Sequence, residues 1–328
     1  MKNKNILHMG KPATTVNTYG GGITAAITDN EIAMNWVYNN YISIFCRTSD
    51  ELYFHDNSYW EQYACPFMFN FMVPREFLKD YNISIKNLII DSINRNSYLG
   101  LYVDKFYIPM SDQYNQKHFY HGIFIYGYDM NKNTTYVCTN LQDGKFVHVN
   151  IDFDDLEKAY WEMDDSSFYI NKVHIFKKLT ENELTETYPL DKRVIKTGIY
   201  NYINSICTLK IESSSSMIFG YNAILHLIET LEKNNNQAVD HRVFHLLWDN
   251  KMIMVDRLKL MSKINMINDD GNYARVYDKI AKNYLSLRNL VLKYNMTRNH
   301  GILPRIYSSL QQFSSDELIT LREIYNLL

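Results

Sequence analysis

Two histidines stand close together in the segment KHFYHGIFIYGYD (117–129), just before an alternating apolar run. His118 and His121 are three residues apart, and residues at that spacing point to opposite faces of a strand. Because GIFIYGY alternates as a strand does, the pair is poorly placed to bind one metal ion, and no nearby carboxylate or cysteine completes a ligand set. We therefore take His121, which opens the strand, as a candidate general base, and His118 as a bystander or supporting group.

Other residues that could hold a metal ion carry a weaker signal. His241 and His245 have the i, i+4 spacing of a helical pair, but they lack the adjacent glutamate of a catalytic HExxH motif. The acidic run DFDD (152–155) is typical of a helix amino terminus, where carboxylates complement the helix dipole. We expect no bound metal or other cofactor.

A histidine at the start of a strand also suits catalysis by a cysteine nucleophile. That chemistry needs a thiolate at a helix amino terminus, a histidine as base, and an Asn or Asp that orients the imidazole. His121 opens one predicted strand and Asn140 ends the next, with Asp143 close behind. We predict His121 as the base and Asn140, or Asp143, as its orienter. Chance placement of a histidine and an asparagine at strand ends is the alternative.

The elements that would position these residues follow from the period of the apolar residues. Helices are expected at 29–40, 84–94 and 152–163. The segments YISIFC and ELYFHD have the alternation of a strand pair, and three further strands are expected at 98–108, 121–129 and 134–140. After about residue 192, five segments have a 3.6-residue period. The predicted organisation is an α+β domain over 1–192 and a helical domain over 193–328.

Composition narrows the class of protein. The 328 residues carry a formal net charge of -2, which gives no electrostatic reason to expect nucleic acid or an anionic membrane as partner. The amino terminus, MKNKNILHMGKPATT, lacks the apolar core of a secretory signal, and no stretch approaches the roughly 18 apolar residues of a membrane span. The four cysteines form no CxxC pair, so a reducing cytoplasm is expected. The apolar helical tail is the predicted place for a homodimer interface.

Three segments, VDKFYIP (103–109), KHFYHGIFIYGYD (117–129) and FDDLEKAY (153–160), match a Tyr-Ile-Pro loop, a His-led strand ending Gly-Tyr-Asp, and a closing helix. In these features the chain resembles the butirosin-biosynthesis protein H-like family of papain-fold, C39-peptidase-like acyltransferases. FGYNAILHLIETLE and HRVFHLLWDNKMIMVDRL are similar to the helical tail of that family. The resemblance implies a papain-like fold, with an antiparallel sheet packed on helices and a helical carboxy-terminal region.

The resemblance also implies a reaction. In that family a nucleophilic cysteine takes an acyl group from the phosphopantetheine thioester of an acyl or peptidyl carrier protein, and a small amine resolves the acyl-enzyme to an amide. The comparison within the group is with the carrier-dependent, amide-forming condensation enzymes of thiotemplated natural-product pathways, of the closthioamide type. Carried over to this chain, His121 would be the general base and Asn140 (or Asp143) its orienter.

The chain departs from this pattern at the nucleophile, because no cysteine precedes Cys46. In the segment NTYGGGITAAITDNEI, Ala25 and Ala26 occupy the place where a helix-start nucleophile is expected. Either the chain is a Cys-to-Ala variant, with the cysteine expected at 26 in preference to 25, or the nucleophile lies elsewhere. The other candidates are weaker in context: Cys46, Cys65, Thr24 and Thr28.

Two rival classes remain beside the acyltransferase. A C39-like cysteine peptidase would hydrolyse peptides and need no carrier, whereas an inactive papain-fold protein would bind a partner without forming an adduct. The aromatic residues that could line a pocket near His121 have packing in the core as their alternative role: Tyr102, Phe106, Tyr107 and Tyr120.

Overall fold

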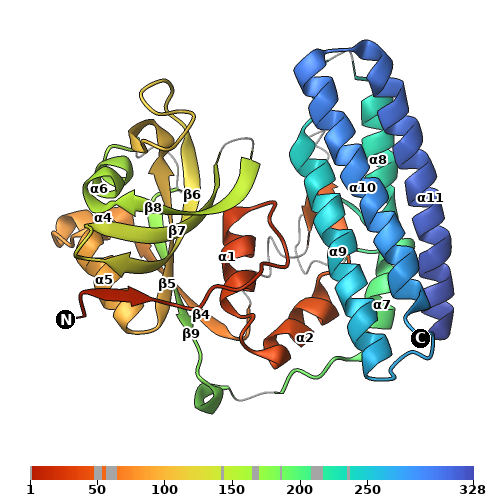
Figure 1. Ribbon diagram of the computed structural model, residues 1–328, viewed down its shortest axis with the longest axis horizontal. Helices are drawn as coiled ribbons and strands as arrows, with labels where there is room; N and C mark the ends of the chain where they lie inside the picture. Colours follow the sequence, from red (N-terminus) through yellow and green to blue (C-terminus); the bar gives the residue numbers. More distant parts are fainter. Residues whose placement is uncertain are drawn as a thin grey trace. The chain divides into compact units, whose positions relative to one another are not determined.

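The computed structural model describes residues 2–47, 54–56, 65–141, 144–164, 170–184, 187–207, 217–234 and 237–328 (Figure 1). The chain divides into two compact units. Unit 1 consists of Met1–Ala33 and Trp60–Thr187, and unit 2 consists of Met34–Tyr59 and Tyr188–Leu328. The prediction divides the chain once, at 192, whereas the structure also assigns the early segment Met34–Tyr59 to the unit of the carboxy-terminal helices.

Unit 1 is built on a mostly antiparallel sheet of seven strands, in the order β4-β9-β5-β6-β7-β8 with β1 paired to β6 (Figure 1). The strands are β1 (Lys4–Ile6), β4 (Met68–Pro74), β5 (Ser97–Asp104), β6 (Tyr120–Asp129), β7 (Thr134–Leu141), β8 (Lys145–Asp152) and β9 (Lys172–Lys178). The predicted strands at 98–108, 121–129 and 134–140 are confirmed as β5, β6 and β7. The first of them ends earlier than predicted, because the short 3-10 helix η1 (Lys105–Tyr107) follows Asp104.

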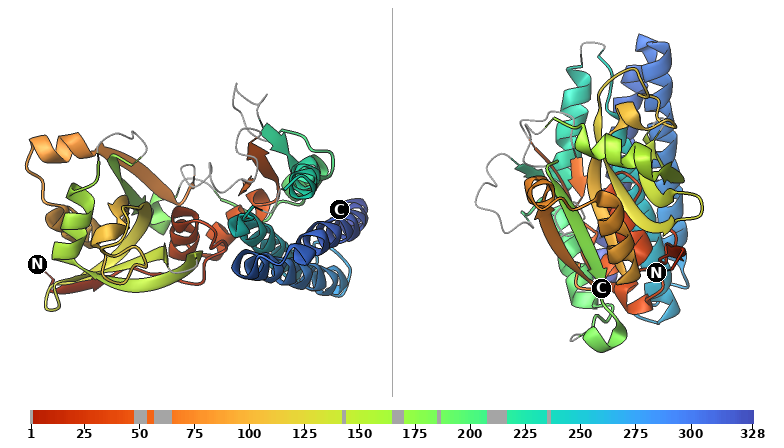
Figure 2. Two further views of the ribbon diagram at one scale, coloured as in Figure 1. Left: turned by 90° about the horizontal axis from the view of Figure 1, so that it is seen from above. Right: turned by 90° about the vertical axis from the view of Figure 1, so that its left-hand side faces the viewer.

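Helices cover both faces of this sheet. On one face, α5 (Ile85–Asn94) and α6 (Phe153–Trp161) share a buried cluster with Ile123 and Ile125 of β6. Phe124 lies between these two residues and contacts α1 (Thr18–Ala26), so α1 lies on the other face of the sheet (Figure 2). The helices expected at 84–94 and 152–163 are confirmed as α5 and α6, and the short helix α4 (Arg75–Asp80) follows β4.

Helix α1 forms although its segment contains three consecutive glycines, which lower helix propensity. Asn17 caps it, accepting a hydrogen bond from the backbone N–H of Gly20 on its side-chain oxygen at 2.6 Å. A Cβ atom at Gly21 would lie 2.5 Å from the ring of Phe146, and one at Gly22 would lie 2.4 Å from Phe124. The glycines therefore let the backbone of α1 approach the sheet more closely than any side chain would allow.

Unit 2 contains the five carboxy-terminal helices that the sequence predicts. They are α7 (Lys192–Ile203), α8 (Gly220–Glu232), α9 (His241–Lys263), α10 (Asn272–Thr297) and α11 (Leu303–Leu327). Helix α10 packs on both α9 and α11, as Figure 2 shows. No helix among the described residues has an apolar stretch long enough to cross a membrane.

Residues from the first quarter of the chain complete unit 2. The helix expected at 29–40 is confirmed as α2 (Glu31–Asn40), which lies in unit 2 from Met34 onward. The expected strand pair is confirmed as β2 (Ile44–Arg47) and β3 (Phe54–Asp56), while residues 51–53 of the second predicted strand lie outside the described residues. Strand β10 (Met217–Phe219) pairs with β2 and makes a three-stranded sheet. Buried Arg257 of α9 donates hydrogen bonds to the carbonyl oxygens of Tyr38 and Tyr41, which ties α2 and the turn after it to the helices.

A fully buried ion pair lies in the core of unit 2. The ammonium of Lys251 on α9 is 2.6 Å from a carboxylate oxygen of Glu317 on α11, and their side chains are 0% and 2% exposed. The hydroxyls of Tyr277 and Tyr284 on α10 donate to the two oxygens of the same carboxylate at 2.8 and 2.9 Å. This network joins three helices. Because its charges are buried, water cannot solvate one of them if its partner is removed.

Removing one member of this pair should strongly destabilise the protein. Lys251→Met would leave the Glu317 carboxylate buried without its counter-ion, and we expect a loss of about 3–5 kcal/mol in the free energy of unfolding of unit 2, measured by urea denaturation. The matched control is Lys282→Met, which removes an exposed lysine from a helical pair with Asp278 and should cost about 1 kcal/mol or less. Equal losses in the two variants would contradict this account of the core.

Candidate functional site

The predicted nucleophile position lies at the carboxy-terminal end of its helix, whereas the proposed chemistry requires the amino-terminal end. Ala25 and Ala26 are the last two residues of α1, not the start of a helix, and both are fully buried. At about 1.5 Å of rise per residue, Ala26 lies about 12 Å along the helix from Thr18. The expectation that a cysteine at 25 or 26 would occupy a helix start is therefore wrong. The expectation failed because three consecutive glycines disfavour a helix, so the sequence did not indicate that a helix begins at Thr18 and ends at these alanines.

The start of α1, in contrast, lies directly against the end of β7. The hydroxyl of Thr18 donates to the side-chain oxygen of Asn140 at 3.0 Å. The amide nitrogen of Asn140 donates to the carbonyl oxygens of Thr15 and Gly144 at 2.8 and 3.0 Å. Asn140 is only 6% exposed, so this predicted site residue holds the helix start and the β7–β8 turn together.

Tyr19 fills the space between the start of α1 and the middle of the sheet. Its ring lies 3.0 Å from the position of a Cβ atom at Gly100 of β5 and 3.3 Å from one at Gly122 of β6. The ring also contacts those of Tyr102, His174 and Phe176, at centroid distances of 6.1, 5.7 and 6.3 Å. With 7% of its surface exposed, Tyr19 packs where two glycines leave room for an aromatic ring.

His121 lies on β6, where it pairs in register with Val103 of β5, and it is half-buried. Its ring stacks on that of Phe119 with a centroid distance of 6.0 Å. Within the described part of the chain, His121 is not among the hydrogen-bond partners of the Asn140 side chain. The role of His121 as a base with Asn140 as orienter stays a prediction, and the alternative orienter, Asp143, lies outside the described residues.

A carboxylate–imidazole pair that the sequence pattern does not predict lies next to this site. Nδ1 of His118 lies 2.5 Å from a carboxylate oxygen of Asp104, which is completely buried at the end of β5. The other oxygen of Asp104 accepts from the backbone N–H groups of Phe106 and Phe119, both at 3.0 Å. Asp104 thus fixes the imidazole of His118, while the ring of Phe106 stacks on it at 4.4 Å. No spacing rule links residues 104 and 118, so only the register of β5 and β6 could have revealed the pair.

A buried lysine connects this pair to Asn140. The Lys105 ammonium donates to the backbone carbonyl of Asn140 at 2.8 Å and lies 5.4 Å from the centre of the Phe119 ring. Burial lowers the pKa of Lys105, and the charge of Asp112 opposes this shift. Lys105 follows β5 directly, within the VDKFYIP segment.

Three of the four aromatic residues predicted near His121 pack against the core. Tyr102, Tyr107 and Tyr120 are partly buried against the core cluster that α5 and α6 cover. The Tyr120 hydroxyl accepts a hydrogen bond from the backbone N–H of Asp164 at 3.2 Å. These contacts favour the core role that the sequence had left open beside the pocket role.

The cysteines in unit 1 are unsuited to nucleophilic attack. Cys65 and Cys138 are 4% and 0% exposed. Burial raises the pKa of the Cys65 thiol to about 12 and raises that of Cys138 still further. A nucleophilic cysteine needs the opposite shift, toward the thiolate. In unit 2, burial likewise raises the pKa of Cys46 to about 12, and Cys207 is exposed.

The threonine alternatives are already engaged in local hydrogen bonds. The Thr24 hydroxyl, fully buried, donates to the carbonyl of Gly20 at 2.7 Å. The Thr28 hydroxyl donates to the carbonyl of Ala25 at 2.8 Å and lies 2.9 Å from Nε2 of His8. Over the residues that the structure describes, no three His, Cys, Asp or Glu side chains are grouped so that they could hold a metal ion.

Comparison with known proteins returns no match, either to a model of a protein family or to a curated protein sequence.

Titration of His174 should make the stability of unit 1 depend on pH. Burial, and to a smaller extent the charge of Lys172, lowers the pKa of His174 from 6.5 to about 4. Between these values the unfolded chain binds a proton that the folded chain does not, so the free energy of unfolding falls as pH decreases from about 6.5 to about 4. The full effect is about 3 kcal/mol.

The measurement is urea unfolding at several pH values in a His245→Gln background, because burial lowers the pKa of His245 in unit 2 to about 4 as well. His174→Phe keeps an aromatic ring stacked on Phe176 and should flatten the pH dependence between pH 6.5 and 4. An unchanged slope in this variant would show that His174 is not the group that titrates.

Proposed function

We propose that the protein binds an acyl or peptidyl carrier protein and that unit 1 is a papain-like domain without a cysteine nucleophile. The observation that carries this proposal is the start of α1, where Thr18 bonds to Asn140 and Tyr19 fills the space above Gly100 and Gly122. In the arrangement that the resemblance implies, a thiolate would stand at this helix start, beside the Asn that ends a strand.

Several features support descent of this unit from a papain-like arrangement. An antiparallel sheet carries a strand that begins near His121, a following strand that ends at Asn140, and a helix whose amino terminus meets that asparagine. A catalytic site of this kind also requires a space in which substrate meets the helix start. The Tyr19 ring, which is almost wholly buried, occupies this space.

The requirement for a reactive thiol separates the two rivals from this proposal. The acyltransferase and the C39-like peptidase both need a reactive thiol close to the base. The two thiols in unit 1 are buried with raised pKa values, which works against thiolate formation at neutral pH. Binding without an acyl-enzyme intermediate requires neither a thiolate nor a base, so it is the class that these side chains support best.

The test uses a carrier protein loaded with a short acyl thioester on its phosphopantetheine. We expect the carrier to bind, measured by isothermal titration calorimetry, and intact-protein mass spectrometry to show no acyl group transferred to this chain. The control variant is Cys207→Ser, because an exposed thiol can be acylated nonspecifically by a thioester.

Two results would overturn the proposal. An acyl adduct that persists in Cys207→Ser and disappears on addition of an amine would show an acyl-enzyme and restore the acyltransferase. Lack of binding to both the loaded and the unloaded carrier would remove the carrier as a partner.

A further inference from the structure

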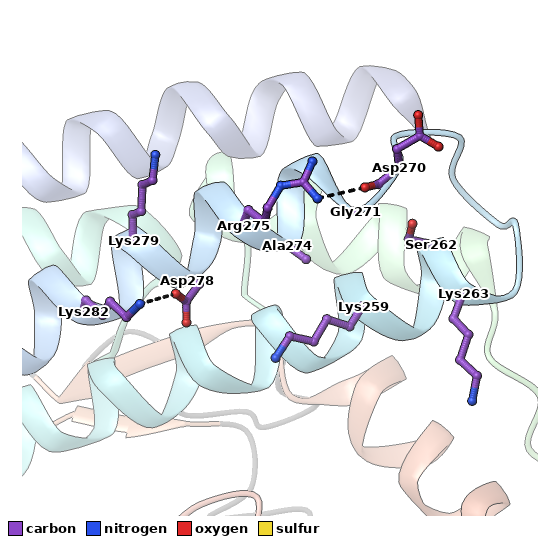
Figure 3. A pocket seen from close by; sticks show the side chains of 10 residues that line it. All are labelled: Lys259, Ser262, Lys263, Asp270, Gly271, Ala274, Arg275, Asp278, Lys279 and Lys282. Carbon is purple, nitrogen blue, oxygen red and sulfur yellow. Dashed lines mark hydrogen bonds and ion pairs between the residues drawn. The ribbon is translucent and has the colours of Figure 1, made fainter.

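A groove lined with positive charge runs between α9 and α10 in unit 2. Its volume is about 740 Å³. Five cationic side chains line it (Figure 3): Lys259 and Lys263 from α9, and Arg275, Lys279 and Lys282 from α10. Two carboxylates, Asp270 and Asp278, also lie in the lining. The balance is positive, although the whole chain has a net charge of -2.

The cations of the groove are only partly neutralised. Lys282 is paired with Asp278 at 2.6 Å, and Arg275 donates to the backbone carbonyl of Asp270 at 3.1 Å (Figure 3). Lys259 has a longer contact, 3.5 Å, with Asp256 outside the groove. Among the described residues, Lys263 and Lys279 form no ion pair. A surplus of positive charge thus remains at the surface of two packed helices.

We propose that this groove docks an acidic helix of a protein partner. Lys259 and Lys263 are four residues apart on α9, and Arg275 and Lys279 are four residues apart on α10, so each pair is spaced about 6 Å along its helix axis. Carboxylates four residues apart on a partner helix have the same spacing and can face these pairs. The lysine stems and Ala274 add apolar surface between the charges.

The geometry favours an acidic helix over a small phosphate compound. A phosphate at a helix amino terminus binds free backbone N–H groups. At the start of α10 the side chain of Asp269 already accepts from the N–H groups of Gly271 and Tyr273, at 3.0 and 2.9 Å. A carboxylate therefore holds the place that a phosphate would take, and the charge available to a ligand lies on long side chains along the groove.

A nucleic acid fits the chain less well than an acidic protein. Nucleic-acid-binding proteins commonly carry a strong overall positive charge, whereas this chain is slightly acidic. The partner need not be a carrier protein, since the charges and their spacing belong to unit 2 alone.

The test measures fluorescence anisotropy of a labelled helical peptide with glutamates at i, i+4 spacing, added to the full chain at low salt. Binding should weaken as salt rises, because exposed charges are screened. The double substitution Lys263→Glu/Lys279→Glu should weaken it by about tenfold or more, since reversed charges repel the peptide. A peptide with lysines in place of the glutamates should not bind.

The matched control is Arg305→Glu/Arg322→Glu, which changes the net charge equally at exposed positions of α11 outside the groove. This variant should bind the peptide within about twofold of the unchanged chain. Circular dichroism checks that both variants keep their helices. Equal loss in both variants, no binding by the unchanged chain, or displacement of the peptide by millimolar inorganic phosphate at constant ionic strength would each overturn the proposal.

Discussion

The close approach of α1 to the sheet is the constraint on which unit 1 depends. Gly21 and Gly22 bring the helix backbone against the rings of Phe146 and Phe124, where an added Cβ atom would lie 2.5 and 2.4 Å from them. A helix with three glycines has a poor intrinsic propensity, so it is packing that stabilises it. Asn140 then fixes the end of the helix that begins at Thr18, and the site follows from where this end is held.

This constraint also determines what the site can do. The helix lies so near the sheet that the side chain of Tyr19, the second residue of α1, packs directly on the strands. Its ring fits there because the strands carry Gly100 and Gly122 at that point. At the start of α1, these features hold an aromatic ring in the core.

The sequence predicted the elements whose apolar pattern is regular. Alternation located β6 and β7, and the 3.6-residue period located all five helices from α7 to α11. It missed α1 because glycine lowers helix propensity and because Phe146, which requires the glycines, is far away in the sequence. The same dependence on residues far apart in the sequence limited the prediction of the site. Asn140 and His121 could be predicted because they lie at strand ends. The Asp104–His118 pair and the contact of Lys105 with Asn140 could not, because they depend on how the strands pair.

Unit 2 treats charge differently in its core and at its surface, and the contrast bears on the groove. Inside unit 2, the cationic Lys251 has the carboxylate of Glu317 within 2.6 Å, since an unpaired buried charge would cost several kcal/mol. In the groove between α9 and α10, Lys263 and Lys279 face water, which solvates them at little cost. Clustered cations that solvent tolerates still repel one another, and that repulsion is relieved when a partner supplies carboxylates. A positive groove on a chain with a net charge of -2 is therefore a local feature that an acidic surface can recognise, and the overall charge of the chain does not produce it.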